Sequence, residues 1–204
     1  MALRIIACVL MGYLLGSLNG AIVISKLAMH EDVREKGSGN AGMTNFLRNF
    51  GGASTLLVIL IDIGKIVLAC FLATFIVPSY PALGKMVAGV SVQVGHILPI
   101  FFGFKGGKGI LCSAGLAIMM DWRIFAICFP VFLLIVVTTK YVSLGSIAAT
   151  ILYAVTFTIF FRGQPWIYGM AIAMAGVAIF QHRGNIVRLL HGEERKTHLH
   201  KSKN

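Results

Sequence analysis

The stretch ASTLLVILIDIGKIVLACFLATFIV, Ala53 to Val77, decides the fold class. A helix needs about 20 apolar residues to cross the hydrocarbon core of a bilayer, and this stretch is long enough. Only Asp62 and Lys65 interrupt it. Each charge alone is expensive inside a bilayer, but a spacing of three residues lets the two neutralise each other on one helix face. We interpret them as a structural ion pair, with a proton or ion relay as the alternative.

The composition of the whole chain agrees with a membrane protein. Of its 204 residues, 57% are hydrophobic and 12% are charged, and the net charge is +11. A soluble domain has about 25% charged residues, and half that number could not cover its surface. The same values exclude a disordered, a collagen-like or a disulfide-rich chain. The sequence therefore predicts an all-α polytopic integral membrane protein.

Seven apolar segments can be separated along the chain, and we predict seven transmembrane helices, some of them short. The segments cover residues 5–25, 53–77, 84–102, 110–120, 124–139, 146–161 and 166–180. In a five-crossing alternative, 84–102 and 110–120 form a re-entrant pair that dips from one side. The first segment is longer than the apolar region of a signal peptide and has no cleavage signal, so we expect a retained helix.

The basic residues set the orientation. With seven crossings, thirteen of the 18 Lys and Arg residues fall on one side and four on the other. The positive-inside rule places the richer side in the cytoplasm, with the N-terminus outside and the C-terminus inside. We expect one transmembrane domain, residues 1–190, and a basic tail, residues 191–204. The tail is interpreted as a strip near anionic headgroups, or else as a plain soluble tail.

Three polar segments fall on the predicted cytoplasmic side. The first polar segment is GSGNAGMTNFLR (37–48), the second is FGFKGGKGI (102–110) and the third is HRGNIVRL (182–189). Glycines let backbone amides approach a ligand closely, and amides that turn inward form a concavity suited to phosphate oxygens. Each segment alone could be a turn, a topology signal or an interfacial collar. In the third segment, the three-residue spacing of His182, Asn185 and Arg188 predicts that they share one face of a helical extension. Their shared composition favours one site for an anionic ligand.

Other chemistries lack their signatures in this sequence. It contains no P-loop, no His-x4-Asp motif, no catalytic carboxylate pair and no zinc constellation. We assign neither a metal nor a disulfide to Cys8, Cys70, Cys112 and Cys128, because all four lie within apolar segments, where thiols behave as small hydrophobes. His96, late in the third apolar segment, is interpreted as a buried, hydrogen-bonded histidine.

GSGNAGMTNFLR, GHILPIFFGFKGGKG and HRGNIVRL together resemble the three cytoplasmic motifs of the bacterial acyl-phosphate:glycerol-3-phosphate acyltransferases, the PlsY family. YLLGS (13–17), the Asp62 and Lys65 pair and YVSLGSI also match, so the resemblance covers nearly the whole chain. It implies a seven-helix protein of the bacterial inner membrane with a cytoplasmic active site and no cofactor. The implied reaction moves an acyl group from acyl phosphate to the 1-hydroxyl of sn-glycerol 3-phosphate. Its products, 1-acylglycerol 3-phosphate and phosphate, belong to phospholipid biosynthesis.

The resemblance also implies the site residues. Four matching residues are assigned to catalysis: Ser38, Lys108, His182 and Asn185. The matching residues assigned to substrate binding are Gly37, Gly39, Asn40, Gly42, Thr44, Asn45, Arg48, Gly106, Gly107, Gly109, Ser143 and Ser146. Ser38 and Arg48 are expected at the glycerol-3-phosphate phosphate, and the Gly/Asn/Thr backbone at the acyl phosphate. Lys108 would neutralise phosphate charge. His182 is one candidate for the general base, and the substrate phosphate is the other.

The expected partners are acyl phosphate, glycerol 3-phosphate and membrane lipids, with no nucleic acid. We expect a monomer that is functionally coupled to the enzyme that forms acyl phosphate. The sequence departs from the family at Asn19, where proline is common, at Met43, at Ile66 and near Glu194. The rival hypotheses are an anion transporter, which would need polar loops on both faces, and a non-catalytic membrane subunit.

Overall fold

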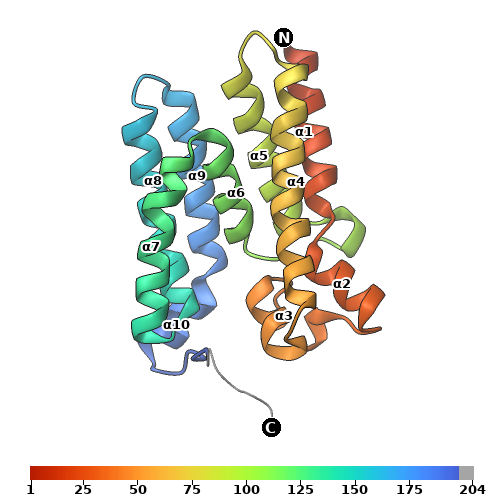
Figure 1. Ribbon diagram of the computed structural model, residues 1–204, viewed down its shortest axis with the longest axis vertical. Coiled ribbons are helices and arrows are strands. Elements are labelled where there is room, and N and C mark those ends of the chain that lie inside the picture. Colours follow the sequence, from red (N-terminus) through yellow and green to blue (C-terminus); the bar gives the residue numbers. More distant parts are fainter. Residues whose placement is uncertain (198–204) are drawn as a thin grey trace. The chain divides into compact units, whose positions relative to one another are not determined.

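Figure 1 shows the computed structural model of the chain, which describes residues 1–197. Every regular element among these residues is a helix, which confirms the predicted all-α class. The α-helices are α1 (Ala2–Ser17), α2 (Gly20–Ala28), α3 (Met43–Phe50), α4 (Ser54–Ile76), α5 (Pro81–Ile97), α6 (Ile110–Met120), α7 (Trp122–Thr139), α8 (Val142–Phe160), α9 (Pro165–Gln181) and α10 (Arg183–Leu190). Two 3-10 turns, η1 (Val33–Glu35) and η2 (Ile100–Phe102), complete the list.

The chain forms two compact units. The first, Met1–Trp122, contains α1 to α6, and the second begins at Arg123 and contains the body of α7 with α8 to α10. We expected a single transmembrane domain over residues 1–190 followed by a tail. Part of that tail, residues 198–204, lies outside the described residues.

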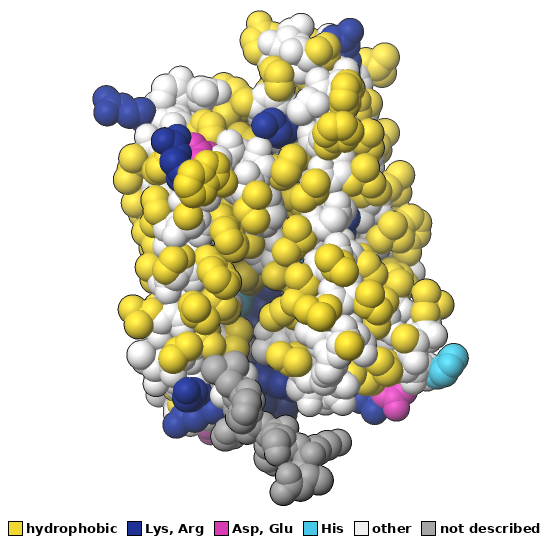
Figure 2. Space-filling view, viewed as in Figure 1, with side chains coloured by type: hydrophobic (Ala, Val, Ile, Leu, Met, Phe, Trp, Pro, Cys, Tyr) yellow, Lys and Arg dark blue, Asp and Glu magenta, His cyan; other side chains and the backbone are white. Residues whose placement is uncertain are grey.

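All seven predicted apolar segments contain helix, and among residues 1–197 five spans are long and apolar enough to cross a membrane. These five are Ala2–Ala28, Ser54–Ile76, Pro81–Phe102, Trp122–Thr139 and Val142–Phe160. The helices α6 and α9 are apolar but shorter, with 11 and 17 residues. Figure 2 shows apolar side chains over the sides of the helices, as a lipid-facing surface requires. These five spans include Pro81–Phe102, so they are not the five of the re-entrant alternative, and seven crossings stay a prediction.

In the first unit, α1, α4 and α5 lie side by side and α6 packs on α4 and α5 (Figure 1). Glycines allow the closest approach: a Cβ atom at Gly12 would lie 2.9 Å from the Cβ of Ser91, and one at Gly95 would lie 2.9 Å from the backbone nitrogen of Ser17. Lipid gives little hydrophobic drive between helices, so small residues and close packing stabilise such contacts.

The predicted first helix, residues 5–25, is broken in the structure. α1 ends at Ser17 and α2 begins at Gly20. In a continuous helix the Gly20 amide would donate to the Gly16 carbonyl. Instead, the Gly20 amide donates to Asp62 Oδ1 at 3.1 Å, and Lys65 Nζ donates to the Gly16 and Leu18 carbonyls at 3.1 Å each.

This break explains the ion pair inside α4. Lys65 Nζ lies 2.8 Å from Asp62 Oδ1, which confirms the predicted pair. Backbone groups freed inside a bilayer must be satisfied by protein. Asp62 accepts from the freed Gly20 amide, and Lys65 donates to the freed Gly16 carbonyl, so the pair replaces the missing helix hydrogen bond. Asn19 completes the repair as the N-cap of α2, because its Oδ1 accepts from the Ile22 amide at 3.1 Å.

The long connection between α2 and α4 is more ordered than a loop. It contains η1 and the short helix α3, which the sequence did not suggest. Phe46 of α3 is fully buried and joins Ile22, Val33, Ala41 and Val58 in an apolar cluster. That cluster holds α3 and the first polar segment against α2 and α4.

In the second unit, α8 packs on α9, and α10 confirms the predicted helical extension of the third polar segment.

Candidate active site

The first polar segment is folded around one buried amide, that of Asn45. Its Oδ1 accepts from the Ser38 amide at 3.0 Å, and its Nδ2 donates to the Val33 and Lys36 carbonyls, also at 3.0 Å. Asn45 was predicted to bind substrate, but these bonds engage its side chain with the backbone of Ser38 and of the residues just before the segment. Gly37 has φ +61°, and a Cβ atom there would contact Asn45. Asn45 therefore shapes the turn that presents Ser38.

The remaining residues of this segment surround the turn and the start of α3. Gly39 also has a positive φ, of +71°. Gly42 is the N-cap of α3. A Cβ atom at Gly42 would lie only 2.7 Å from Asn40 Nδ2, so the Asn40 side chain packs against this glycine. Thr44 lies in the first turn of α3 and Arg48 in its last turn. Ser38 and Arg48 are exposed, as groups that meet a soluble phosphate should be.

The second polar segment is anchored to the end of α5. The amide of Gly106 donates to the Ile97 carbonyl and the amide of Gly107 to the His96 carbonyl, both at 3.1 Å. These two glycine amides were expected to face a ligand, but they hold the loop instead. Gly109 has φ +81° and is the N-cap of α6, so Lys108 lies just before a helix N-terminus. Helix N-termini favour anions, and Lys108 adds a positive charge there.

The two segments are joined directly. The Ala41 amide donates to the Gly106 carbonyl at 3.4 Å. The structure thus brings together the first and second polar segments, as the sequence predicted, with Ser38, Arg48 and Lys108 all in the first unit.

Sequence reasoning missed a second link, from Arg34. Its Nη1 donates to the Phe102 carbonyl at 2.6 Å and to the Lys105 carbonyl at 3.3 Å. Asp32 holds the same guanidinium through both carboxylate oxygens, at 2.7–3.2 Å. The hydrogen bond from Arg34 lowers the pKa of Asp32 well below its ordinary value, although burial opposes the shift. The sequence signal was the Asp-Val-Arg triplet, in which we counted Arg34 only toward topology.

In the second unit, the polar residues converge on Glu194. Its Oε1 accepts from Ser143 Oγ at 2.8 Å and from Asn185 Nδ2 at 2.7 Å, and its Oε2 accepts from Arg188 Nε at 2.8 Å. Burial acts to raise the pKa of Glu194, but the hydrogen bonds from Asn185, Ser143 and Arg188 prevail and lower it. The structure therefore brings Ser143 together with the third polar segment. The predicted helical face of His182, Asn185 and Arg188 is completed by a carboxylate.

His182 and Ser146 are both buried. His182 Nδ1 lies 2.8 Å from the Ala178 carbonyl. A carbonyl only accepts, so Nδ1 carries a hydrogen, and in the neutral ring the lone pair is then on Nε2. Ser146 Oγ donates to the Val142 carbonyl at 2.9 Å, one turn earlier in α8. The hydroxyl hydrogen of Ser146 is thus engaged with the helix backbone, while its oxygen retains acceptor capacity.

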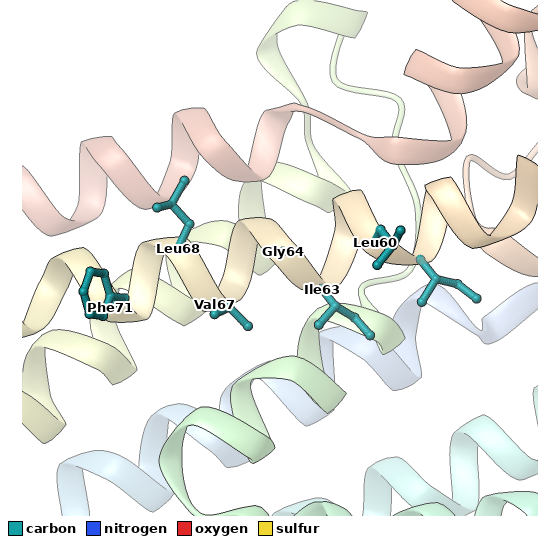
Figure 3. Close-up of a pocket in the computed structure, with 7 residues that line it drawn as sticks. Leu60, Ile63, Gly64, Val67, Leu68 and Phe71 are labelled. Carbon is teal, nitrogen blue, oxygen red and sulfur yellow. The ribbon is translucent and has the colours of Figure 1, made fainter.

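An apolar groove follows one face of α4 (Figure 3). It encloses about 400 Å³ and is lined by Ile59, Leu60, Ile63, Gly64, Val67, Leu68 and Phe71. Gly64 makes a notch in this face, because no atom apart from its chain neighbours and the local helix backbone lies within 4 Å of the point where its Cβ would stand. The groove is on the α4 surface that carries neither Asp62 nor Lys65, since both of those are buried.

Comparison with known proteins gives consistent matches along the chain. The family described as glycerol-3-phosphate acyltransferase matches residues 6–192. A glycerol-3-phosphate acyltransferase from Finegoldia magna is 40% identical over 184 residues, covering 90% of this chain and 91% of that protein. One from Thermoanaerobacter sp. strain X514 is 37% identical and covers 92% of both chains.

Two solved structures of the integral membrane glycerol 3-phosphate acyltransferase PlsY share the fold. The glycerol 3-phosphate form superimposes with a TM-score of 0.86 at 36% identity, over 95% of this chain and 96% of that one. The lysophosphatidic acid form has a TM-score of 0.82 at 34% identity, over 95% of both chains. With the motifs in order and the helices matched over nearly their full length, this membrane enzyme belongs to the glycerol-3-phosphate acyltransferase family to which PlsY belongs.

Proposed function

We propose that the chain transfers an acyl group from acyl phosphate to the 1-hydroxyl of sn-glycerol 3-phosphate. The products are 1-acylglycerol 3-phosphate, which is lysophosphatidic acid, and inorganic phosphate. The observation that supports this most directly is the match to PlsY in its glycerol 3-phosphate and lysophosphatidic acid forms, which correspond to the proposed acceptor and product. Acyl phosphate as the donor follows from the resemblance of the three polar segments.

Both proposed substrates carry phosphate, so the site needs positive charge and donor groups. Ser38 and Arg48, exposed on one turn and one short helix, are proposed to hold the glycerol-3-phosphate phosphate. Arginine suits this role because its planar fork can make two hydrogen bonds to one phosphate. Lys108, beside the N-terminus of α6, is proposed to neutralise charge on phosphate as it leaves.

The remaining glycines and polar residues of the first unit are proposed to shape the binding surface. The turns at Gly37, Gly39 and Gly109 have positive φ, which glycine adopts at no steric cost. Gly42, Asn40 and Thr44 are proposed to offer backbone or side-chain donors to acyl phosphate. Asn45, Gly106 and Gly107 are proposed to act indirectly, because their hydrogen bonds hold the loops.

In the proposed reaction the 1-hydroxyl oxygen attacks the acyl carbonyl carbon and forms the new ester bond. The bond from that carbon to the phosphate oxygen breaks, and phosphate departs with its electron pair. The hydroxyl proton passes to a base, for which the lone pair on His182 Nε2 is suited. Phosphate is already a good leaving group, so positioning and charge stabilisation suffice without a covalent enzyme intermediate.

In the second unit, Asn185 is proposed to position the glycerol moiety. Its Nδ2 donates to Glu194, which fixes the amide so that Oδ1 has a defined direction. Ser143 is held by the same carboxylate, and Ser146 offers an acceptor oxygen. The expectation that all three polar segments serve one pair of substrates stays a prediction.

The acyl chain needs an apolar environment, and we propose the groove on α4 for part of it. The groove is apolar along its whole length and is widened at Gly64. A hydrocarbon chain there would remain in contact with surrounding lipid. This assignment is tested below by filling the notch.

We also propose seven crossings in the bacterial inner membrane, with the N-terminus outside and the active site on the cytoplasmic face. The distribution of Lys and Arg supports this orientation. The protein would act as a monomer, functionally coupled to the enzyme that forms acyl phosphate. A cysteine placed at Asn40 should react with a membrane-impermeant reagent in inverted vesicles and stay unlabelled in intact cells. Labelling in intact cells would reverse the orientation.

The decisive assay uses the purified full-length protein in detergent with palmitoyl phosphate and glycerol 3-phosphate. We expect release of inorganic phosphate and formation of lysophosphatidic acid in equal amounts. Palmitoyl-CoA, offered as the donor in parallel, should give no product. Product from palmitoyl-CoA alone would overturn the proposed donor, and no product from either donor would overturn the proposed reaction.

A further inference from the structure

Four buried polar side chains meet at the break in the first span. Asn19, Asp62, Lys65 and His96 are all at most 5% exposed, and they come from the N-cap of α2, from α4 and from α5. Polar and charged groups within a membrane span are expensive, so such a group needs a reason. Part of that reason is the repair of the helix break by Asp62 and Lys65. The N-cap bond to Asn19 Oδ1 belongs to that repair, but the repair does not account for the Asn19 amide nitrogen or for His96.

The contacts of His96 link these four side chains to one another. Lys65 Nζ lies 3.0 Å from His96 Nδ1, and Asn19 Nδ2 lies 3.4 Å from the same atom. Asp62 Oδ1 is also 3.4 Å from it. Two donors and one carboxylate oxygen therefore surround the same ring nitrogen. These three contacts hold the imidazole in one orientation.

The other side of this group touches both polar segments of the first unit. Asn19 Nδ2 donates to the Ala41 carbonyl at 3.0 Å, and the Ala41 amide donates to Gly106. The His96 carbonyl accepts from the Gly107 amide at 3.1 Å. A Cβ atom at Gly107 would meet His96 Nε2 and would lie 2.7 Å from the Ala41 carbonyl oxygen. The two segments therefore meet next to Asn19 and His96, and each segment is hydrogen-bonded to one of these residues.

We propose that Asn19 and Lys65 are positioning residues for acyl transfer, which hold the first and second polar segments in register through Ala41 and His96. This rests on the proposed function, because Ser38 and Arg48 lie on one segment and Lys108 on the other. The phosphates of the two proposed substrates are bound well only if the two segments hold these three side chains at the correct distance from one another. Misplacement by about 1 Å can cost a hundred-fold in rate, so a small slip between the segments is enough.

The sharpest variant is Asn19→Ser. Serine is a good N-cap, so α2 keeps its cap, but the shorter side chain loses the amide that reaches Ala41. The second variant is Asp62→Asn with Lys65→Met, which removes both charges of the ion pair together. The matched control is Lys85→Met in the same unit, because Lys85 Nζ donates to the Met119 carbonyl at 3.1 Å, away from both segments.

Each variant is purified in detergent and its kcat, KM for glycerol 3-phosphate and melting temperature are measured. Stabilisation by glycerol 3-phosphate alone is measured too, as a binding readout that needs no turnover. We expect Asn19→Ser and the double variant to lose about ten-fold or more in kcat/KM, mainly through a higher KM. Their ligand-induced stabilisation should shrink, while the unliganded melting temperature of Asn19→Ser stays within about 3 °C of the wild type. Lys85→Met should keep wild-type kinetics.

Wild-type kinetics and ligand stabilisation in Asn19→Ser would overturn the proposal. So would a loss of rate that only follows the fraction of unfolded protein, with KM unchanged. If the wild type binds glycerol 3-phosphate but transfers no acyl group, the proposed reaction fails, and the binding readout still decides the positioning role. If the wild type neither binds nor reacts, both proposals fail.

Discussion

Ser143 donates its hydroxyl to the carboxylate of Glu194 at 2.8 Å, although 51 residues separate them in the chain. The hydrogen bond ties the start of α8 to the chain that follows α10. The same carboxylate holds Asn185 and Arg188, so one acidic residue orders the polar part of the second unit. Glu194 is 7% exposed, so its charge depends on these partners. Its role is therefore to hold Ser143, Asn185 and Arg188 in place, and its loss should disturb the positions of all three side chains.

The first prediction concerns Glu194→Gln. The glutamine can accept at one atom but its amide nitrogen would face a donor, so at least one of the three hydrogen bonds is lost. Buried hydrogen bonds to charged groups contribute about 1.5–3 kcal/mol each, and we expect a destabilisation of that size. Thermal unfolding in detergent measures it. Glu193→Gln is the control, because Glu193 is exposed and adjacent. Equal melting temperatures for the two variants would contradict the prediction.

The second prediction is acid sensitivity. The pKa of Glu194 and that of Asp32 are both lowered in the folded protein. A carboxyl group with a lowered folded pKa contributes stability above its unfolded pKa, which is about 4 for Asp and Glu, and loses that contribution as pH falls further. The melting temperature should therefore drop below about pH 4 more steeply in the wild type than in Glu194→Gln or Asp32→Asn. Parallel curves for all three proteins would contradict it.

The third prediction separates the two lysines of the second polar segment. Lys108 is half-buried beside the N-terminus of α6, whereas the Lys105 side chain is exposed. Lys108→Ala should reduce turnover by at least about a hundred-fold, as removal of a charge-stabilising donor does in other enzymes. Lys105→Ala should stay within a few-fold of the wild type. Phosphate release measures both, with melting temperature as the folding control. Similar losses at both positions would mean that general positive charge is what matters.

The sequence predicted the elements whose stability is local. The bounds of α6 agree with the predicted segment 110–120, because glycine precedes it and a charged residue follows it. The helical extension after His182 was also predicted correctly, from the three-residue spacing of its polar groups. In both places, the residues that decide the structure are neighbours in the chain.

The sequence did not reveal features that depend on distant partners. The break at Asn19 interrupts an uncharged apolar run, and it is satisfied by Asp62 and Lys65 on another helix. α3 was missed because it is short and polar, and it is held by burial of Phe46. Glu194 had only a weak motif match, since its partners lie elsewhere in the chain. Hydrogen bonds between polar groups that are far apart in the sequence cannot be predicted from the local pattern of residues.

The fourth prediction is that Arg34→Lys weakens substrate binding. The guanidinium holds Asp32 with one edge and the Phe102 and Lys105 carbonyls with Nη1, and a lysine ammonium cannot reproduce this fork. The second polar segment should then be less well placed, with KM for glycerol 3-phosphate raised by about ten-fold and a smaller change in kcat. Arg162→Lys, at an exposed position in the second unit, is the control. An unchanged KM would show that the link between the segments does not depend on Arg34.

The last prediction tests the α4 groove with Gly64→Leu. The leucine side chain would fill the open notch without a clash, because the glycine position has no neighbour within 4 Å. If the acyl chain lies there, kcat/KM should fall about ten-fold for palmitoyl phosphate, and by less for octanoyl phosphate, which would occupy less of the groove. Gly169→Leu on α9 is the matched control, since that glycine is equally open. Equal effects on the long and the short donor, or equal effects of the two leucines, would place the acyl chain elsewhere.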